Sequence, residues 1–421
     1  MRHSTFFYII TQHAQQIVIT SHHHINAPPT IFNSFPRRWY NQAMYLDRTY
    51  RPRRRYRGIG RFWPLIILAV LGVILYEEQP TWLFPQEITP TPVPTRSAIF
   101  YQAEAEAAIR GGRYDDAFPA FEEMKRLEPD NPAAYVALSE LYIIFRDIDE
   151  ALRVAQEAVS VAPENADALV ARARALNWQE DNDNAVIDAL DALDIEPDHA
   201  TAYAVLGEIY TDVGQWDIAD GYLTQALTLE PENITALRNR AYYYERQGDY
   251  EDAVAGYEAA IAAAPYRFDL YIELGRQYSI GLGEFEKAVE TYRKAVEVYE
   301  APITLDALGE GLYNRGDHLQ AVRELRRAVE MNDHYGPARV HLGMALFARR
   351  NFEDAALHLE IGLQLIGDQA RVENLYTLGL AYIYKEPREC EKAIPWLQKA
   401  LALSPENGPA LDGLATCSSN P

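Results

Sequence analysis

Residues 200–267 read ATAYAVLGEIYTDVGQWDIADGYLTQALTLEPEN and then ITALRNRAYYYERQGDYEDAVAGYEAAIAAAPYR, two segments of 34 residues with one pattern. In each segment an apolar stripe at helical spacing precedes a glycine, Gly214 or Gly248. A second stripe follows and ends at a proline, Pro231 or Pro265. A glycine tolerates the positive φ that ends a helix, and a proline stops the next one. Each segment therefore predicts two helices joined by a short turn.

The same step continues in both directions. The alanine that follows the turn recurs at Ala117, Ala151, Ala185, Ala219, Ala253, Ala288, Ala321, Ala355 and Ala393. This pattern resembles the tetratricopeptide-repeat family, whose unit is a helix–turn–helix of about 34 residues. The resemblance covers residues 98–407 as nine units and implies an all-α, right-handed α-solenoid. Residues 408–421 are predicted to form a capping helix and tail, because a solenoid must cover its last interface.

The period is irregular in its second half. The repeat that begins near Phe268 has an extra residue in its turn (residues 281–283), and the ninth repeat has a longer turn (residues 385–389). We therefore expect the superhelix to bend irregularly across residues 281–390.

A different signal lies near the N-terminus. The run from Phe62 to Tyr76 contains no charged residue, although a helix of that length rises only about 22 Å against a hydrocarbon core of about 30 Å. We interpret residues 62–84 as a single transmembrane anchor with interfacial aromatic residues. A cleaved signal peptide is the alternative, but no small-x-small cleavage site follows Tyr76.

The segments beside the apolar run differ in charge. Residues 1–61 contain ten arginines and one acid, Asp47, for a charge of +9. Because the net charge of the whole chain is −22, the remaining residues carry a net charge of −31. Arginine-rich sequence before the run and Glu77 and Glu78 after it predict a cytoplasmic N-terminus and an extracytoplasmic repeat array at the cell membrane. We expect residues 1–61 to be a disordered basic tail, with translation starting at Met44, and the Pro/Thr-rich residues 85–97 to be a linker.

The acidic body excludes some functions and leaves others open. It would repel a phosphate backbone, so we expect no nucleic-acid binding. The sequence contains no phosphate-binding loop, zinc-protease or serine-hydrolase motif, which predicts a protein that is not an enzyme and needs no cofactor. The scattered histidines have no ligand spacing, which predicts no metal site.

The family resemblance implies a binding groove lined by the first helix of each repeat, at its second, fifth, ninth, twelfth and thirteenth positions. The groove residues carried over in this way are Arg174, Asn177 and Trp178 in the third repeat, Arg238, Tyr242, Glu245 and Arg246 in the fifth, Arg276 in the sixth, and Tyr313 and Asn314 in the seventh. Four arginines in an acidic domain indicate an acidic or carboxylate-terminated peptide as ligand. The alternative is that these arginines pair with nearby glutamates on ordinary helix faces.

The two cysteines lie at the end of the array. Cys390 stands at the start of a second helix and Cys417 near the end of the capping helix. In stacked repeats those two points are neighbours, so we predict a disulfide that pins the cap, with two free thiols as the alternative.

We conclude that the chain is a membrane-anchored scaffold that binds proteins or peptides through its concave groove. The alternative is an accessory protein of envelope polymer synthesis or export that binds a glycan or lipid-linked substrate there.

Overall fold

The computed structural model describes residues 62–78 and 96–419. The predictions of a basic tail at residues 1–61, of a translation start at Met44, and of most of the linker at residues 85–97 lie outside the described residues. The chain divides after Thr91 into two units, which are considered separately below.

The first unit contributes one helix, α1 (Trp63–Glu78). Its side chains from Phe62 to Ile74 are exposed and almost all apolar. At 16 residues it is about 24 Å long. In the part of the chain that the structure describes, no helix combines the length and the apolar character needed to cross a membrane. The prediction of a transmembrane helix over residues 62–84 is therefore not supported within residues 62–78, where α1 is shorter than a membrane span, and residues 79–84 of that prediction lie outside the described residues.

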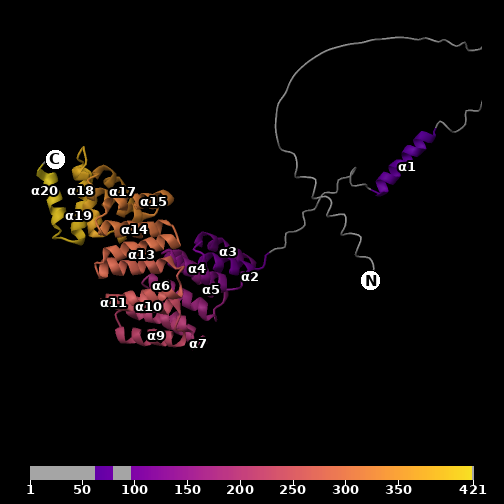
Figure 1. Ribbon diagram of the computed structural model, residues 1–421, viewed down its shortest axis with the longest axis horizontal. Coiled ribbons are helices and arrows are strands. Elements are labelled where there is room, and N and C mark those ends of the chain that lie inside the picture. The colour runs from indigo at the N-terminus through magenta and orange to yellow at the C-terminus, as the bar shows by residue number, and fades with distance from the viewer. Residues whose placement is uncertain (1–61, 79–95, 420–421) are drawn as a thin grey trace, which may run out of the picture. The chain divides into compact units, whose positions relative to one another are not determined.

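The second unit is built of nine helix–turn–helix pairs and a final helix, with no strand in residues 96–419 (Figure 1). The pairs are α2 (Ala98–Arg110) with α3 (Tyr114–Leu127), α4 (Ala133–Ile144) with α5 (Ile148–Val161), α6 (Ala166–Trp178) with α7 (Asn182–Ile195), α8 (Ala200–Asp212) with α9 (Trp216–Leu229), α10 (Ile234–Gln247) with α11 (Tyr250–Ala263), α12 (Phe268–Arg276) with α13 (Phe285–Val298), α14 (Pro302–Asn314) with α15 (His318–Met331), α16 (Gly336–Ala348) with α17 (Phe352–Ile366), and α18 (Val372–Tyr384) with α19 (Cys390–Leu403). The final helix is α20 (Gly408–Ser419). The predicted all-α solenoid of nine repeats is confirmed, and its right-handed twist stays a prediction.

Small residues allow the two helices of a repeat to pack closely. A Cβ added at Gly207 would lie 2.5 Å from Cγ of Leu223, and one added at Gly275 would lie 2.5 Å from Cε1 of Tyr292. Both partners are buried core residues. A larger side chain at either glycine would force the helices apart, which explains why the sequence repeats a small residue there.

The extra residue of the sixth repeat is accommodated at the end of its first helix. Residues Gln277–Gly281 (η1) form a π-helical turn, and the amide of Leu282 donates to the carbonyl of Gln277 at 2.9 Å. Such a turn takes up one additional residue without interrupting the hydrogen bonds. A short 3₁₀ segment, η2 (Gly367–Gln369), lies between α17 and α18.

Repeats far apart in sequence meet and close the first six into a ring. The hydroxyl of Tyr114, on α3, donates to the carbonyl of Tyr266 at 2.7 Å, and the hydroxyl of Tyr299 donates to Asp115 at 2.7 Å. Tyr114 is fully buried, and its ring centroid lies 5.1 Å from that of Phe268. Figure 1 shows the indigo helices of the first repeats close to the orange α13. The sequence did not predict this closure.

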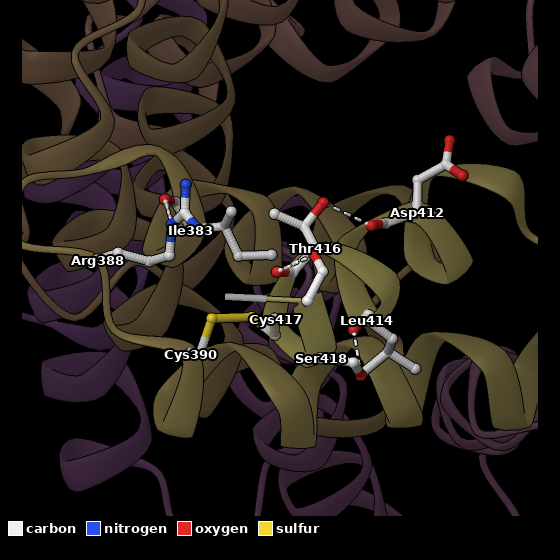
Figure 2. The surroundings of a disulfide bond; sticks show 9 residues. Ile383, Arg388, Cys390, Asp412, Leu414, Thr416, Cys417 and Ser418 are labelled. Carbon is white, nitrogen blue, oxygen red and sulfur yellow. Dashed lines mark hydrogen bonds between the residues drawn. A yellow bond between two sulfur atoms is a disulfide. The ribbon is translucent and has the colours of Figure 1, made fainter. Parts of the chain in front are cut away.

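The C-terminal end of the array is capped by α20. A disulfide joins Cys390, the first residue of α19, to Cys417 on α20, with an S–S distance of 2.10 Å and a Cα–Cα distance of 5.6 Å (Figure 2). This is the pairing expected from the sequence. Ala410 and Gly413 of α20 are buried against the last repeat. The cap therefore covers an apolar face that would otherwise end the solenoid in water.

Candidate binding cavity

The ring encloses a polar cavity of about 760 Å³. It is formed by the first helices of repeats three to six, the start of α7 and the turn after α4. The residues that line it are Arg146, Asn177, Trp178, Glu180, Asn182, Glu208, Asp212, Arg238, Tyr242, Arg246, Ile272 and Arg276. Six of the ten predicted groove residues are among them.

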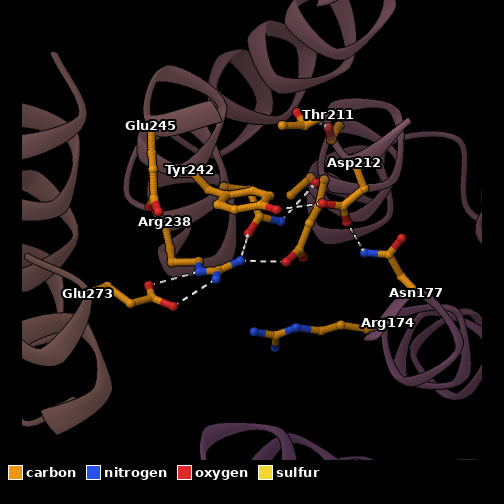
Figure 3. A network of polar contacts seen from close by, with 12 residues as sticks. Arg174, Asn177, Thr211, Asp212, Arg238, Tyr242, Glu245 and Glu273 are labelled. Atoms are coloured by element: carbon orange, nitrogen blue, oxygen red, sulfur yellow. Dashed lines mark hydrogen bonds and ion pairs between the residues drawn. The ribbon is translucent and has the colours of Figure 1, made fainter. Parts of the chain in front are cut away.

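The guanidinium of Arg238 is the centre of the cavity wall (Figure 3). Its Nη1 donates to Oε1 of Glu208 at 2.5 Å, and its Nε and Nη2 bind the two carboxylate oxygens of Glu273 at 3.0 and 2.7 Å. All three side chains are buried. Burial disfavours the charge of Glu273, but the positive charges of Arg238 and Arg146 outweigh it and hold the pKa of Glu273 well below its usual value. Arg238 thus ties α8, α10 and α12 together.

Arg146 covers one side of the cavity. It follows α4 with a positive φ of 63°, an uncommon conformation for a residue with a side chain. Its Nη2 donates to Glu273 at 2.9 Å, and its guanidinium carbon lies 4.2 Å from the ring centroid of Trp178. Arg238 approaches the same ring at 5.5 Å and the ring of Tyr242 at 5.1 Å. One face of the Trp178 ring and one face of the Tyr242 ring are therefore already covered by guanidinium groups.

A second polar cluster surrounds Asp212, one helical turn after Glu208. Its two carboxylate oxygens accept a hydrogen bond from the hydroxyl of Tyr242 at 2.6 Å and from the amide of Asn177 at 2.8 Å. Burial raises the pKa of Asp212, and the negative charge of Glu208 adds to the effect. Burial and the bond to Asp212 likewise raise the pKa of Tyr242.

Several buried polar atoms of the wall have no hydrogen-bond partner among the described residues. They are Oε2 of Glu208, Oδ1 of Asn177, Oδ1 of Asn182 and Nε1 of Trp178. Buried polar atoms are nearly always satisfied in folded proteins, so atoms of this kind around one cavity are typical of a binding site.

The arginines at the edge of the cavity differ in their pairing. Arg276 is 39% exposed and lies 3.1 Å from Glu245. Arg246 is exposed, and no carboxylate of the described residues lies within ion-pair distance of it. The predicted reversal of charge is thus much weaker than four free arginines would give, because Arg238 and Arg276 are paired with acids.

Four predicted groove residues do not line the cavity, and one of them is Glu245, the partner of Arg276. Arg174 is buried beside it, with Nη1 3.9 Å from Glu140, and burial lowers the pKa of Arg174. Tyr313 stacks near His318, and Asn314 donates to Ser279 at 3.4 Å. These two residues belong to the later repeats, outside the ring.

The cavity residues that the sequence analysis missed fall into two groups, one with a sequence signal and one without. Glu208 and Asp212 occupy the ninth and thirteenth positions of α8, so the same register applied to the fourth repeat would have found them. Arg146, Glu180 and Asn182 lie in or beside inter-helix turns, where the register of the first helix gives no information. In the described residues no group of three or more His, Cys, Asp or Glu side chains is placed to hold a metal ion.

Comparisons with known protein families agree with this architecture. Residues 205–268 and 307–370 match one model of the tetratricopeptide repeat, and residues 268–302 match a second. Residues 107–224 match the model of the ChAPs, the Chs5p-Arf1p-binding proteins. The chain is therefore a protein with tetratricopeptide repeats.

Individual relatives cover parts of the chain. The Protein CTR9 homolog of Arabidopsis thaliana is 30% identical over 170 residues, which is 39% of this chain and only 15% of that protein. The Cut9 and Hcn1 hetero-tetramer of the APC/C has a chain that matches 72% of this one, over 59% of its own length, with 20% identity and a TM-score of 0.56. The human IFIT1 dimer with PPP-AAAA matches 76% of this chain and 82% of its own, with 15% identity and a TM-score of 0.50. At these identities the solved structures show the shared fold alone.

Proposed function

We propose that this chain is a scaffold that binds a peptide segment of a protein partner in the ring cavity and catalyses no reaction. The observation that carries the proposal is the cavity itself, whose volume of about 760 Å³ is built from five consecutive repeats. Volumes of about 300–1,000 Å³ are typical of ligand sites, and a few peptide residues fill such a space. The match to the Chs5p-Arf1p-binding proteins supports a role in linking proteins.

The chemistry at the edge of the cavity supports part of the sequence-based proposal. An acidic side chain or a C-terminal carboxylate would find Arg246, which is exposed and has no acid at ion-pair distance among the described residues. Arg276 would contribute through the part of its guanidinium that Glu245 leaves free. Arginine donates two parallel hydrogen bonds to a carboxylate, so one such contact gives both orientation and affinity.

A glycan in the cavity remains the second candidate, but one observation weighs against it. Sugars stack on free aromatic faces, and Arg146 lies 4.2 Å from the ring of Trp178 while Arg238 lies 5.1 Å from that of Tyr242. A stacking sugar would have to displace these guanidinium groups, and Arg238 is fixed by two buried carboxylates.

We also propose that the repeat array lies on the non-cytoplasmic side of a cell membrane with the N-terminus inside. The disulfide between Cys390 and Cys417 supports this location, since such bonds persist in oxidising compartments. The proposal is tested by adding a membrane-permeant thiol reagent to intact cells without reductant. Labelling of both cysteines would contradict it, and resistance to labelling is the expected result.

The binding proposal is tested by affinity capture with the full chain. The Arg246→Glu and Arg276→Gln double variant alters the cavity edge without touching the buried ion pairs of Arg238. Arg293→Glu is the matched control, because Arg293 is exposed on α13 and does not line the cavity. A partner retained by wild type and control and lost by the double variant is expected. A partner retained by all three proteins would refute binding in the cavity.

A further inference from the structure

Among the described residues, the fully buried polar atoms of the cavity wall that have no partner are mainly acceptors, whereas Arg246 and Arg276 present exposed N–H donors. Three unpartnered oxygens line the wall, on Glu208, Asn177 and Asn182, against one unpartnered donor, Nε1 of Trp178. Glu208 is 2% exposed and Asn177 6%, so neither oxygen reaches bulk water. A buried acceptor without a hydrogen bond is unfavourable, and a hydrogen bond from a ligand donor would remove that cost.

Negative charge accompanies these acceptors. Asp212 receives hydrogen bonds only from the neutral groups of Tyr242 and Asn177, and no cationic side chain of the described residues forms an ion pair with it. Glu208 uses one oxygen for Arg238 and leaves the other without a partner. We call Asn177, Asn182, Glu208 and Asp212 the acceptor corner.

The acceptor corner is unsuited to an anion. An incoming carboxylate or phosphate would meet Glu208 and Asp212, and Arg238, the buried arginine paired with Glu208, already binds two carboxylates. The chain as a whole has a net charge of −22, which attracts cations toward the array and repels anions.

We propose that the acceptor corner binds the ammonium or guanidinium group of a peptide ligand, supplied by a lysine or arginine side chain or by a free N-terminus. The proposal rests on the proposed function, since it names the chemistry of one end of the same peptide. Such a group offers three or more N–H donors to the unpartnered oxygens and a positive charge to Asp212. The amide oxygens of Asn177 and Asn182 accept hydrogen bonds without adding negative charge, so they can bind the N–H groups of an organic cation. A peptide that places a carboxylate near Arg246 and a cation in the acceptor corner would use both kinds of charged group that line the cavity.

The test compares short peptides on one neutral framework by calorimetric titration of the full chain. The probes are acetyl-Ala-Ala-X-Ala-Ala-amide with X as lysine, arginine, norleucine or glutamate, and alanine pentapeptide amide with a free N-terminus. Lysine or arginine is expected to bind at least about ten-fold more tightly than norleucine, in line with one charge-assisted hydrogen bond. Tight binding of the unacetylated peptide instead would assign the corner to an N-terminal ammonium.

Two variants locate the effect. Asn182→Ala removes one acceptor from the first turn of α7 and leaves the buried ion pairs intact, and Asp212→Asn removes the charge while keeping the shape. Each is expected to lower the preference for lysine over norleucine several-fold, whereas Arg293→Ala, on the exposed side of α13 and outside the cavity lining, leaves that preference unchanged. Circular dichroism confirms that each variant folds.

Three results would overturn the proposal. They are equal binding of lysine and norleucine peptides, tighter binding of the glutamate peptide, and a lysine preference that survives both Asn182→Ala and Asp212→Asn. Absence of heat with every peptide at millimolar concentration also overturns it, because the corner would then be filled by water alone. None of these results bears on partner capture, so a partner lost in the Arg246 and Arg276 variant would still support the proposed function.

Discussion

Replacing Arg238 with methionine should destabilise the array more than any other single change in the cavity. The substitution keeps an unbranched apolar stem, shortens the side chain and removes four hydrogen bonds, two to Glu273, one to Glu208 and one to Asn239. Glu208 and Glu273 are each 2% exposed, so the two carboxylates would stay buried with less compensation. Removing one partner of a buried ion pair costs about 3–5 kcal/mol. In the variant Glu273 would still pair with Arg146 at 2.9 Å, so only Glu208 would lose its one cationic partner. The expected loss is therefore that of one broken buried pair and not of two.

The loss is measured by guanidinium denaturation of the full chain followed by circular dichroism at 222 nm. Because repeat arrays unfold locally, protease sensitivity of the fourth to sixth repeats is a second readout. A triple variant, Arg238→Met with Glu208→Gln and Glu273→Gln, should regain about half of the loss, because neutral amides cost less to bury than unpaired carboxylates. The control is Arg126→Met, which breaks an exposed pair with Glu123 and should leave the denaturation midpoint unchanged. A single variant within 1 kcal/mol of wild type, or a triple variant no better than the single one, would refute the reasoning.

Three further predictions concern other parts of the array. Reduction of the Cys390–Cys417 bond, which spans 27 residues, should lower the stability of the C-terminal cap by about 3.5 kcal/mol. Hydrogen exchange of α20 with and without reductant measures this loss, and α20 should be the first helix that a protease cleaves after reduction. Burial alone would lower the pKa of His341, but Asp306, at 2.7 Å, raises that pKa to about 9. The free energy that the protonated His341 adds to folding is therefore fully present below about pH 6.5 and is lost as the pH rises through 9. Between pH 7 and pH 10 the wild type should lose up to about 3 kcal/mol more stability than His341→Gln, as measured by denaturation at each pH. Gly112→Ala should open the ring, because Gly112 has φ of +69° and an added Cβ would collide with the carbonyl of Val298, and a larger radius of gyration in solution scattering checks this. An unchanged radius would show that the ring tolerates the methyl group.

The repeat could be predicted from the sequence because its signals are local. A small residue such as Gly207 and a turn glycine such as Gly248 recur at a fixed step, and each acts within its own helix pair. The ring could not be predicted in the same way. Tyr114 and Tyr266 meet across 152 residues, and whether they meet depends on small rotations summed over five repeats.

The sequence predicted where part of the cavity lies but not how its charges pair. Family positions on the first helices placed six of its residues, but they gave no information on charge pairing. In the structure the inner side chains pair with the neighbouring repeat at a separation of 30, 31 or 35 residues: Arg238 with Glu208 and Glu273, Arg276 with Glu245, and Asp212 with Asn177 and Tyr242. A search of the sequence for opposite charges at those separations would have found the acids that neutralise the predicted arginines.

This spacing also explains why most of the buried, unpartnered atoms of the cavity wall are acceptors. Arg238 takes an acid from the repeat on each side, so its charge is satisfied before any ligand arrives. Glu208 and Asp212 stand on the same helix, and the one hydrogen bond that the described residues of the preceding repeat donate to them comes from the amide of Asn177. Because the ring holds the positive groups in place, a ligand gains little by competing for them and more by satisfying the oxygens that remain. Recognition in this cavity should therefore follow the donors of the partner, with Arg246 at the edge as the one place where a carboxylate is favoured.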